Sequence, residues 1–292
     1  MKKFLSFILC LILLVTGMVA CDIPSDTTQT EATTTSASTP ASDEQTTEQT
    51  TTAASTTASA KKDITLNIAT FNIHNGADVN YEYPVLANDL KLHKLDIVGL
   101  QEVDMNTERN GKQDTMKILS ERTGMAHYVF APAMDYKGGE YGIAVLSKYP
   151  ILSHEVVNLP LADGETEPRI MLHTVIDVEG YHLDFFVAHG SQKRAQDQLI
   201  KASEYTSKCD AFIYLGDYNT RHFEYFDVFK NAYTVNNADN YIITTVSGDA
   251  PFDNIVLSDI FIAKNVTAVN TGHSDHKMLK AEVTIPLPQP KS

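Results

Sequence analysis

The chain has 292 residues, of which 43% are hydrophobic, and a formal net charge of −14 with histidine neutral. Residues 61–292 alone carry a net charge of −10 and are long enough for one substantial domain with a buried core. Polynucleotide binding depends largely on basic side chains that neutralise phosphates. The acidic balance therefore weighs against a polynucleotide as the main substrate, although it leaves room for a local basic groove.

The first twenty residues have the three parts of a secretory signal: basic Lys2 and Lys3, an apolar run over 4–15, and small residues before Cys21. The apolar run is short for a bilayer span, which favours a cleaved signal peptide over residues 1–20. Residues 18–21, Met-Val-Ala-Cys, resemble a bacterial lipobox, in which the cysteine is diacylated and becomes the new N-terminus. The alternative is an ordinary signal peptide cut near Ala20.

Residues 21–60 are mainly Thr, Ser, Ala, Gln, Asp and Glu, with no aromatic residue. Such a segment cannot bury enough apolar surface to offset the entropy of ordering, so we predict a disordered linker. It would separate a membrane anchor at Cys21 from a catalytic domain over 61–292. Cys209 is the single cysteine of that domain, which excludes an internal disulfide and a cysteine metal site. We expect a packed thiol there.

Short apolar runs that are rich in β-branched and aromatic residues, and bounded by turn residues, predict ten strands. They cover 66–72, 96–102, 126–130, 142–147, 151–158, 170–178, 181–189, 211–217, 252–257 and 279–285. Helical periodicity predicts helices over 83–93, 115–122, 195–207 and 222–230. Many strands interleaved with few helices indicate an α/β fold of two packed, mixed sheets flanked by helices.

Polar side chains stand where several predicted strands end. They are Asn72, Glu102, His189, Asp217 and Asn219, followed nearer the C-terminus by Asp253, Asp275 and His276. Strand ends in α/β folds are rigid positions from which side chains converge on a shared cleft. Each residue also has a structural explanation when taken singly, such as a turn residue, a helix cap or a solvated loop carboxylate.

Eight segments in order carry a resemblance to a known family: ATFNIHNG (69–76), LQEVD (100–104), YGIAVLSKYPI (141–151), EPRIML (167–172), AHGSQ (188–192), LGDYNT (215–220), FDNIVLS (252–258) and SDHKML (274–279). Together they resemble the consecutive blocks of the endonuclease/exonuclease/phosphatase family. The resemblance runs from about residue 64 to 285. It implies a DNase I-like, four-layer α/β sandwich and hydrolysis of a phosphoester by in-line attack of water.

The resemblance assigns Asn72 and Glu102 to a divalent metal ion. A strand-end carboxylate with a neutral amide oxygen suits Mg²⁺ or Mn²⁺, which prefer oxygen ligands. It makes Asp217 the residue that orients and deprotonates water, with Asn219 as a donor to the transition state.

In the same resemblance, His189 and His276 donate to phosphate oxygens, more strongly when protonated, and Asp253 orients His276. Asp275 then lies beside the metal or supports the strand end. Arg109 and Arg169 are candidate substrate-binding residues, because a guanidinium suits phosphate recognition. A surface or capping role is the alternative for each.

Two departures from the family pattern alter the expected wall of the cleft. Ala188 and Gly190 flank His189, where many members have threonine and a bulky residue. Met278 stands where a proline is common after the final histidine. These changes spare the catalytic side chains, so they bear on the substrate rather than the reaction.

The sequence therefore predicts a phosphoesterase that is lipid-anchored at the extracellular face of a bacterial membrane, is monomeric, and acts on a small or lipid-linked phosphoester. Two alternatives remain open. One is an extracellular nuclease on the same fold, since fold alone does not fix the substrate. The other is a lipid-tethered binding module without turnover.

Overall fold

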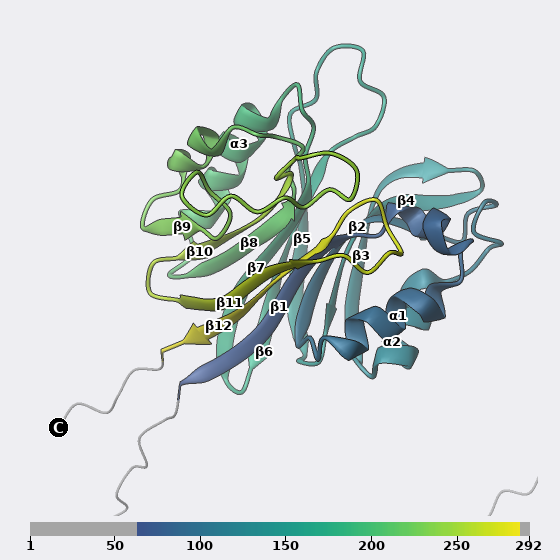
Figure 1. Ribbon diagram of the computed structural model, residues 1–292, viewed down its shortest axis with the longest axis horizontal. Coiled ribbons are helices and arrows are strands. Elements are labelled where there is room, and N and C mark those ends of the chain that lie inside the picture. The colour runs from purple at the N-terminus through teal and green to yellow at the C-terminus, as the bar shows by residue number, and fades with distance from the viewer. Residues whose placement is uncertain (1–62, 287–292) are drawn as a thin grey trace, which may run out of the picture. The chain divides into compact units, whose positions relative to one another are not determined.

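The computed structural model describes residues 63–286 (Figure 1). The chain divides into two units, Met1–Thr56 and Thr57–Ser292, and every described residue belongs to the second. The predicted signal peptide, the linker and Cys21 lie outside the described residues. Within 63–286, no helix is long and apolar enough to cross a membrane.

The first of two sheets has six strands in the order β11-β12-β1-β2-β4-β3. β1 runs parallel to β2, and the other neighbours pair antiparallel. The strands are β1 (Ile64–Asn72), β2 (Ile97–Met105), β3 (His127–Tyr136), β4 (Gly139–Ser147), β11 (Ile262–Val269) and β12 (Met278–Ile285).

The second sheet also has six strands, in the order β5-β6-β7-β8-β10-β9. β7 runs parallel to β8, and the other pairs are antiparallel. The strands are β5 (Ile151–Asn158), β6 (Ile170–Val178), β7 (Tyr181–His189), β8 (Phe212–Asp217), β9 (Ala232–Thr234) and β10 (Asp253–Ser258). Each sheet thus contains one parallel pair, β1–β2 and β7–β8.

Three apolar clusters define four layers. The largest lies between the sheets, where inward-facing residues of both meet. A second packs α1 (Tyr83–Leu92) and α2 (Thr115–Thr123) on the outer face of the first sheet. A third packs α3 (Ala195–Thr206) and the 3₁₀ helix η2 (Phe223–Val228) on the outer face of the second sheet. Figure 1 shows the helices on opposite sides of the paired sheets, so the predicted four-layer sandwich is confirmed.

Local sequence explains several boundaries. α2 begins after Asp114, whose side chain accepts a hydrogen bond from the Lys117 backbone amide at 2.9 Å, and ends at Gly124 in the left-handed region. The predicted ranges of β5, β6 and β7 match the structure. The predicted helix over 222–230 is wrong in type and length, because only Phe223–Val228 forms a 3₁₀ helix.

Three elements were not predicted. The 3₁₀ helix η1 (His74–Val79) contains left-handed residues, so it lacks helical periodicity. β9 is only three residues long. β11 is a largely exposed edge strand whose pairing with β12 shifts register between Lys264 and Thr267, which breaks its alternating pattern.

The sheets approach closely at Gly99 of β2. A Cβ built on Gly99 would lie 2.3 Å from Leu215 Cδ1 and 2.7 Å from Val187 Cγ2, both on the second sheet. Real side chains do not tolerate such distances, so only glycine permits the observed spacing between β2 and β7–β8. This spacing positions the strand ends that carry the candidate site.

We predict that Gly99→Ala lowers the free energy of unfolding by about 1–3 kcal/mol, the usual cost of overpacking a core. In a Leu215→Ala background, which removes the nearer clash, the same substitution should cost clearly less. Chemical denaturation of the four variants in this cycle measures both effects. An equal cost in both backgrounds would show that the inter-sheet contact does not constrain Gly99.

Candidate active site

The predicted site residues gather at one edge of the sandwich, where strands of both sheets end. Asn72 ends β1, while His189 and Asp217 end the parallel pair β7 and β8. Asp253 begins β10, which is antiparallel to β8, and pairs with Asp217 across the two strands. Antiparallel pairing thus brings the start of β10 to the end of β8.

Asn72 links the two sheets at this edge. Its amide nitrogen Nδ2 donates to Glu102 Oε1 and to Asp217 Oδ2, each at 3.0 Å, while Oδ1 accepts from the His74 amide at 3.0 Å. Because both carboxylates are acceptors, the amide must present its nitrogen to them. Asn72 therefore acts here as a donor that positions two carboxylates, and its assignment to a metal stays a prediction.

Glu102 is directed into the site by an irregular backbone. Its φ is +56°, and the pairing of β2 with β4 shifts register between Leu100 and Val103. Left-handed backbone at a non-glycine residue is strained and is often found at functional sites, and bulges redirect side chains. Burial raises the pKa of Glu102, the hydrogen bond from Asn72 lowers it, and Asp217 raises it again.

Asp217 is the most enclosed acid of the site, with 1% of its surface exposed. Burial, followed by the charge of Asp253, raises its pKa to about 6, against the lowering effects of His276 and Asn72. Its Oδ1 accepts a hydrogen bond from the backbone N–H of Asn219 at 2.9 Å. Both carboxylate oxygens therefore have donors that fix their direction.

Asn219 and His189 form one wall of the site. Asn219 Nδ2 donates to the Gly190 carbonyl at 3.2 Å and lies 3.3 Å from His189 Nε2. A donor facing Nε2 makes that nitrogen an acceptor, which assigns the proton to Nδ1. Burial, followed by the charges of Arg169 and His276, lowers the pKa of His189 well below its usual value. We therefore assign a neutral His189, not the protonated form expected from the sequence.

Asp253 and His276 form a buried pair on the other side of Asp217. Asp253 Oδ2 lies 2.8 Å from His276 Nδ1, and His276 Nε2 lies 3.5 Å from Asp217 Oδ2. Burial alone would lower the pKa of His276, but the charges of Asp253 and Asp217 outweigh it and raise that pKa to about 10. These three buried side chains thus form a compact charge network around Asp217, and their ligand atoms all lie within 4.8 Å of one another.

Asp275 stands at the open rim with 53% of its side chain exposed, 3.7 Å from His74 Nδ1. His74 Nδ1 also lies 2.8 Å from Asp78 Oδ2. The charge of His74 lowers the pKa of Glu102, and the charge of Asp275 raises it. Ser274 fixes this segment, because its hydroxyl donates to the Asn72 carbonyl at 2.7 Å. His74, Asp78 and Asp275 therefore form a group of ligand-type side chains at the rim, close enough to Glu102 for His74 and Asp275 to affect its pKa.

The two candidate arginines differ in their surroundings. Arg169 Nη1 lies 2.7 Å from Glu167 Oε1. The buried Nε of Arg169 has no hydrogen-bond partner within the described residues. Arg109 instead makes two hydrogen bonds to Asp104, at 2.6 and 2.7 Å, and stacks on Tyr136 at 4.4 Å. The structure thus leaves donor capacity on Arg169, whereas the guanidinium of Arg109 is held by protein partners.

The sequence matches the family described as "PGAP2IP, C-terminal nuclease-like domain" over residues 61–222, more than half of the chain. This chain belongs to that family, within the endonuclease/exonuclease/phosphatase group. Protein cwh43 of Schizosaccharomyces pombe is 31% identical over 138 residues, which are 46% of this chain. The chain spans only 14% of the length of that relative.

Solved structures share the fold of this nuclease-like domain. An endonuclease/exonuclease/phosphatase from Beutenbergia cavernae has a TM-score of 0.62 at 18% identity, over 76% of this chain and 72% of that one. A mannosyl-6-phosphatase from Bacteroides thetaiotaomicron gives 0.58 at 19%, over 75% and 99%. The human Nocturnin catalytic domain with bound sulfate gives 0.58 at 16%, over 77% and 97%. These likenesses confirm the DNase I-like fold.

Sequence reasoning missed Glu167 and His74 as members of the site of this family domain. Glu167 Oε1 lies 3.7 Å from His189 Nδ1 as well as beside Arg169, so it joins the two groups. It belongs to the EPRIML segment, in which the sequence points only to Arg169 as a candidate site residue. His74 follows the FN pair of the first block, and only the turn of η1 places it beside Asp275.

We predict that Asp253→Asn and His276→Ala each lower turnover by about two to four orders of magnitude, the scale of a positioned proton donor. The double variant should be little worse than His276→Ala, because residues that act as a unit are strongly non-additive. Steady-state kinetics of the cycle tests this, with circular dichroism and melting as controls for folding. Losses that multiply, or a silent Asp253→Asn, would make Asp253 a structural residue.

Proposed function

We propose that this family domain is a divalent-metal-dependent phosphoesterase that acts on a small or lipid-linked phosphoester outside the cell. The observation that supports this most is the position of Asp217. It lies between Asn72 and Glu102 on one side and the Asp253–His276 pair on the other. One buried carboxylate is thereby shared between a candidate cation-binding rim and a charged proton donor.

The donor set fits Mg²⁺ or Mn²⁺. Glu102 is desolvated yet retains a free carboxylate oxygen beyond the one that Asn72 contacts, and Asp275 lies nearby. Hard cations prefer such oxygen ligands. A bound cation supplies Lewis-acid polarisation and charge neutralisation at phosphoryl oxygens. We assign Glu102 as its principal ligand and Asn72 as the residue that orients Glu102.

The remaining side chains supply proton transfer and charge stabilisation. Asp217, aligned by Asn72 and Asn219, accepts a proton from an attacking water. The imidazolium of His276, kept charged by Asp253, donates to a phosphoryl oxygen or to the leaving group. Arg169 through Nε and neutral His189 through Nδ1 donate hydrogen bonds to the charge that develops in the transition state, and Asn219 joins them when its Nδ2 turns from His189 Nε2 to a phosphoryl oxygen.

The rim of the site favours a phosphoester other than a polynucleotide. Asp78, Glu102, Glu167 and Asp275 make it acidic, and a polynucleotide would bring many phosphates past these carboxylates. The relatives support both substrate classes, since one structural neighbour is a mannosyl-6-phosphatase while the family description reads nuclease-like. A nuclease is thus the second candidate. A binding module without turnover is disfavoured by the full set of catalytic side chains.

Export and anchoring rest on the sequence outside the described residues. The signal architecture over 1–20, the lipobox-like Cys21 and the polar linker to residue 60 support a lipoprotein whose domain is held off the outer face of a bacterial membrane. A linker of this composition lets the active site reach lipid-linked or cell-wall substrates. We propose that the domain works as a monomer.

The test of the reaction class is a panel assay of the protein with Mg²⁺ against sphingomyelin, phosphoinositides, mannose phosphates, generic phosphodiesters, DNA and RNA. Turnover of a small or lipid-linked phosphoester, lost in Asp217→Asn, would support the proposal. Preferential cleavage of DNA or RNA would favour the nuclease. Binding without turnover of any substrate would support the non-catalytic module.

We predict that Glu102→Gln weakens activation by Mg²⁺ and lowers turnover by about two orders of magnitude or more, because the neutral amide removes the charged ligand. The melting temperature should stay close to that of the wild type. Glu140→Gln, which changes an exposed glutamate of β4, is the matched control and should remain active. Full activity after chelator treatment would contradict the metal assignment.

We predict that Cys21→Ala releases the protein into the culture medium, because a diacylglyceryl-modified cysteine provides the stable anchor. Cell fractionation followed by immunoblotting measures the shift from membrane to medium. The Cys209→Ala variant is the control and should stay with the membrane. A Cys21→Ala protein that remains membrane-bound at the wild-type level would show that the anchor lies elsewhere.

A further inference from the structure

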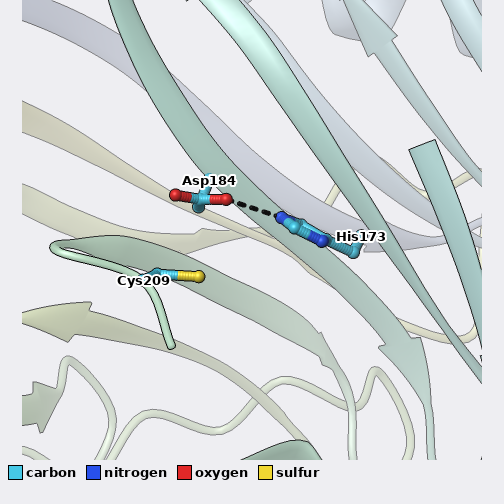
Figure 2. A group of neighbouring side chains, drawn as sticks. All are labelled: His173, Asp184 and Cys209. Carbon is cyan, nitrogen blue, oxygen red and sulfur yellow. Dashed lines mark hydrogen bonds and ion pairs between the residues drawn. The ribbon is translucent and has the colours of Figure 1, made fainter. Parts of the chain in front are cut away.

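A second cluster of ligand-type side chains lies on the outer face of the second sheet, away from the candidate active site. It consists of His173 on β6, Asp184 on β7 and Cys209 in the connection between α3 and β8. One ligand atom from each residue lies within 4.8 Å of the other two. Figure 2 shows Asp184 joined to His173, with the Cys209 sulfur beside them.

Strand register explains how two members of this cluster meet. His173 pairs with Phe186 across β6 and β7, and its ring stacks on the Phe186 ring at 4.1 Å with an interplanar angle of 7°. Asp184 lies two residues before Phe186, so it shares the same face of β7. The stacked ring directs Nε2 to Asp184 Oδ1 at 2.7 Å. The imidazole is therefore fixed in position before any ligand binds.

Cys209 reaches the cluster from above the sheet. It is partly buried, and its thiol donates a weak hydrogen bond to the Tyr205 carbonyl at 3.8 Å. Burial, followed by the charge and hydrogen bonding of Asp184, raises the pKa of Cys209 to about 12. The free thiol is thus protonated at neutral pH and is a poor nucleophile, which agrees with the packed thiol expected from the sequence.

The cluster opens into a cavity of about 340 Å³ that is also lined by Glu155, Tyr205 and Lys208. Glu155 stands directly opposite His173 in the pairing of β5 with β6, which places a second carboxylate at the same opening. The Lys208 ammonium lies 4.6 Å from the Tyr205 ring, a cation–π contact. The cavity therefore offers one thiol, one imidazole and two carboxylates.

We propose that His173, Asp184 and Cys209 bind a thiophilic divalent cation, for which Zn²⁺ is the best match. Zinc accepts sulfur, nitrogen and oxygen ligands in tetrahedral geometry, with adjacent ligand atoms about 3.3–3.6 Å apart. The three ligand atoms lie within 4.8 Å of one another, and His173 Nε2 and Asp184 Oδ1, now 2.7 Å apart, would separate by several tenths of an ångström to share the ion. Water or Glu155 would take the fourth position. As the ion binds, the imidazole proton would move from His173 Nε2 to Nδ1, which frees the Nε2 lone pair, and the Cys209 thiol would lose its proton to solvent, so that one proton is released in all.

This site is separate from the candidate active site. Asp184 lies five residues before His189 on β7, about 16 Å along the strand, and an odd separation places the two side chains on opposite faces. The cation would tie the α3–β8 connection to β6 and β7, so its effect is on stability. The single domain cysteine led us to expect no cysteine metal site, because sequence spacing does not show that His173 and Asp184 come beside it.

The test is a titration of the full chain, treated with chelator and then kept in excess Mg²⁺, with Co²⁺ as a spectroscopic probe for Zn²⁺. We expect a thiolate-to-cobalt absorption band at one equivalent of Co²⁺ and release of about one proton per ion. Competing Zn²⁺ should abolish the band and raise the melting temperature. Phosphoesterase activity should not depend on this ion.

Cys209→Ser should abolish the band, and Asp184→Asn should weaken Zn²⁺ binding by roughly a hundredfold while preserving side-chain volume. The matched control, His154→Ala, removes an exposed histidine of the neighbouring strand β5 and should bind like the wild type, as should Glu102→Gln. No thiolate band in the wild type would overturn the proposal. So would a band that persists in Cys209→Ser, since Cys10 or Cys21 would then be its source.

Discussion

The structure of the site depends on keeping one carboxylate, Asp217, buried where the two sheets meet. An isolated buried charge is costly, so Asp217 requires partners, and the fold supplies them from different elements. Asn72 comes from the first sheet, Asn219 from the turn after β8, and His276 from the segment before β12. Loss of the inter-sheet contact with Asn72 would remove one of these donors from the buried carboxylate. Packing of the sandwich and organisation of the site are thus one constraint.

That constraint also separates the two histidines into different protonation states. His276 faces Asp253 and Asp217, whose charges favour the imidazolium, whereas His189 is buried beside the positive charges of Arg169 and His276. The site therefore holds one charged and one neutral imidazole around the same carboxylate. A phosphoryl transfer reaction needs both a proton donor and neutral hydrogen-bond donors, and this arrangement provides them at neutral pH.

Much of the fold could be predicted because its strands carry strong local signals. β5, β6 and β7 were placed correctly, and the eight ordered segments led to the right architecture. Elements that depend on tertiary contacts could not be predicted, such as η1 and the edge strand β11. In the site, the sequence indicates which residues lie at strand ends, but it does not indicate which partners their side chains face. The sequence could not show that the Asn72 amide faces two carboxylates, or that Asp104 engages Arg109.

The departures from the family pattern have physical explanations in the packing around the site. A Cβ on Gly190 would lie 3.0 Å from the Tyr218 carbonyl oxygen and 3.2 Å from Gln198 Oε1, so a larger residue would displace the turn that carries Asn219. Gln198 in turn accepts from the Ser191 amide at 2.8 Å and donates to the Pro160 carbonyl at 2.7 Å. The segment after His189 is thereby tied to α3 and to the loop that leads to Glu167. In place of the common proline, Met278 is fully buried in the cluster beneath α1. Gly190 thus bears on the turn that carries Asn219, whereas Met278 belongs to the core beneath α1, contrary to the cleft wall expected from the sequence. Both leave the Asp253–His276 pair in place, since Asp253 Oδ2 still lies 2.8 Å from His276 Nδ1.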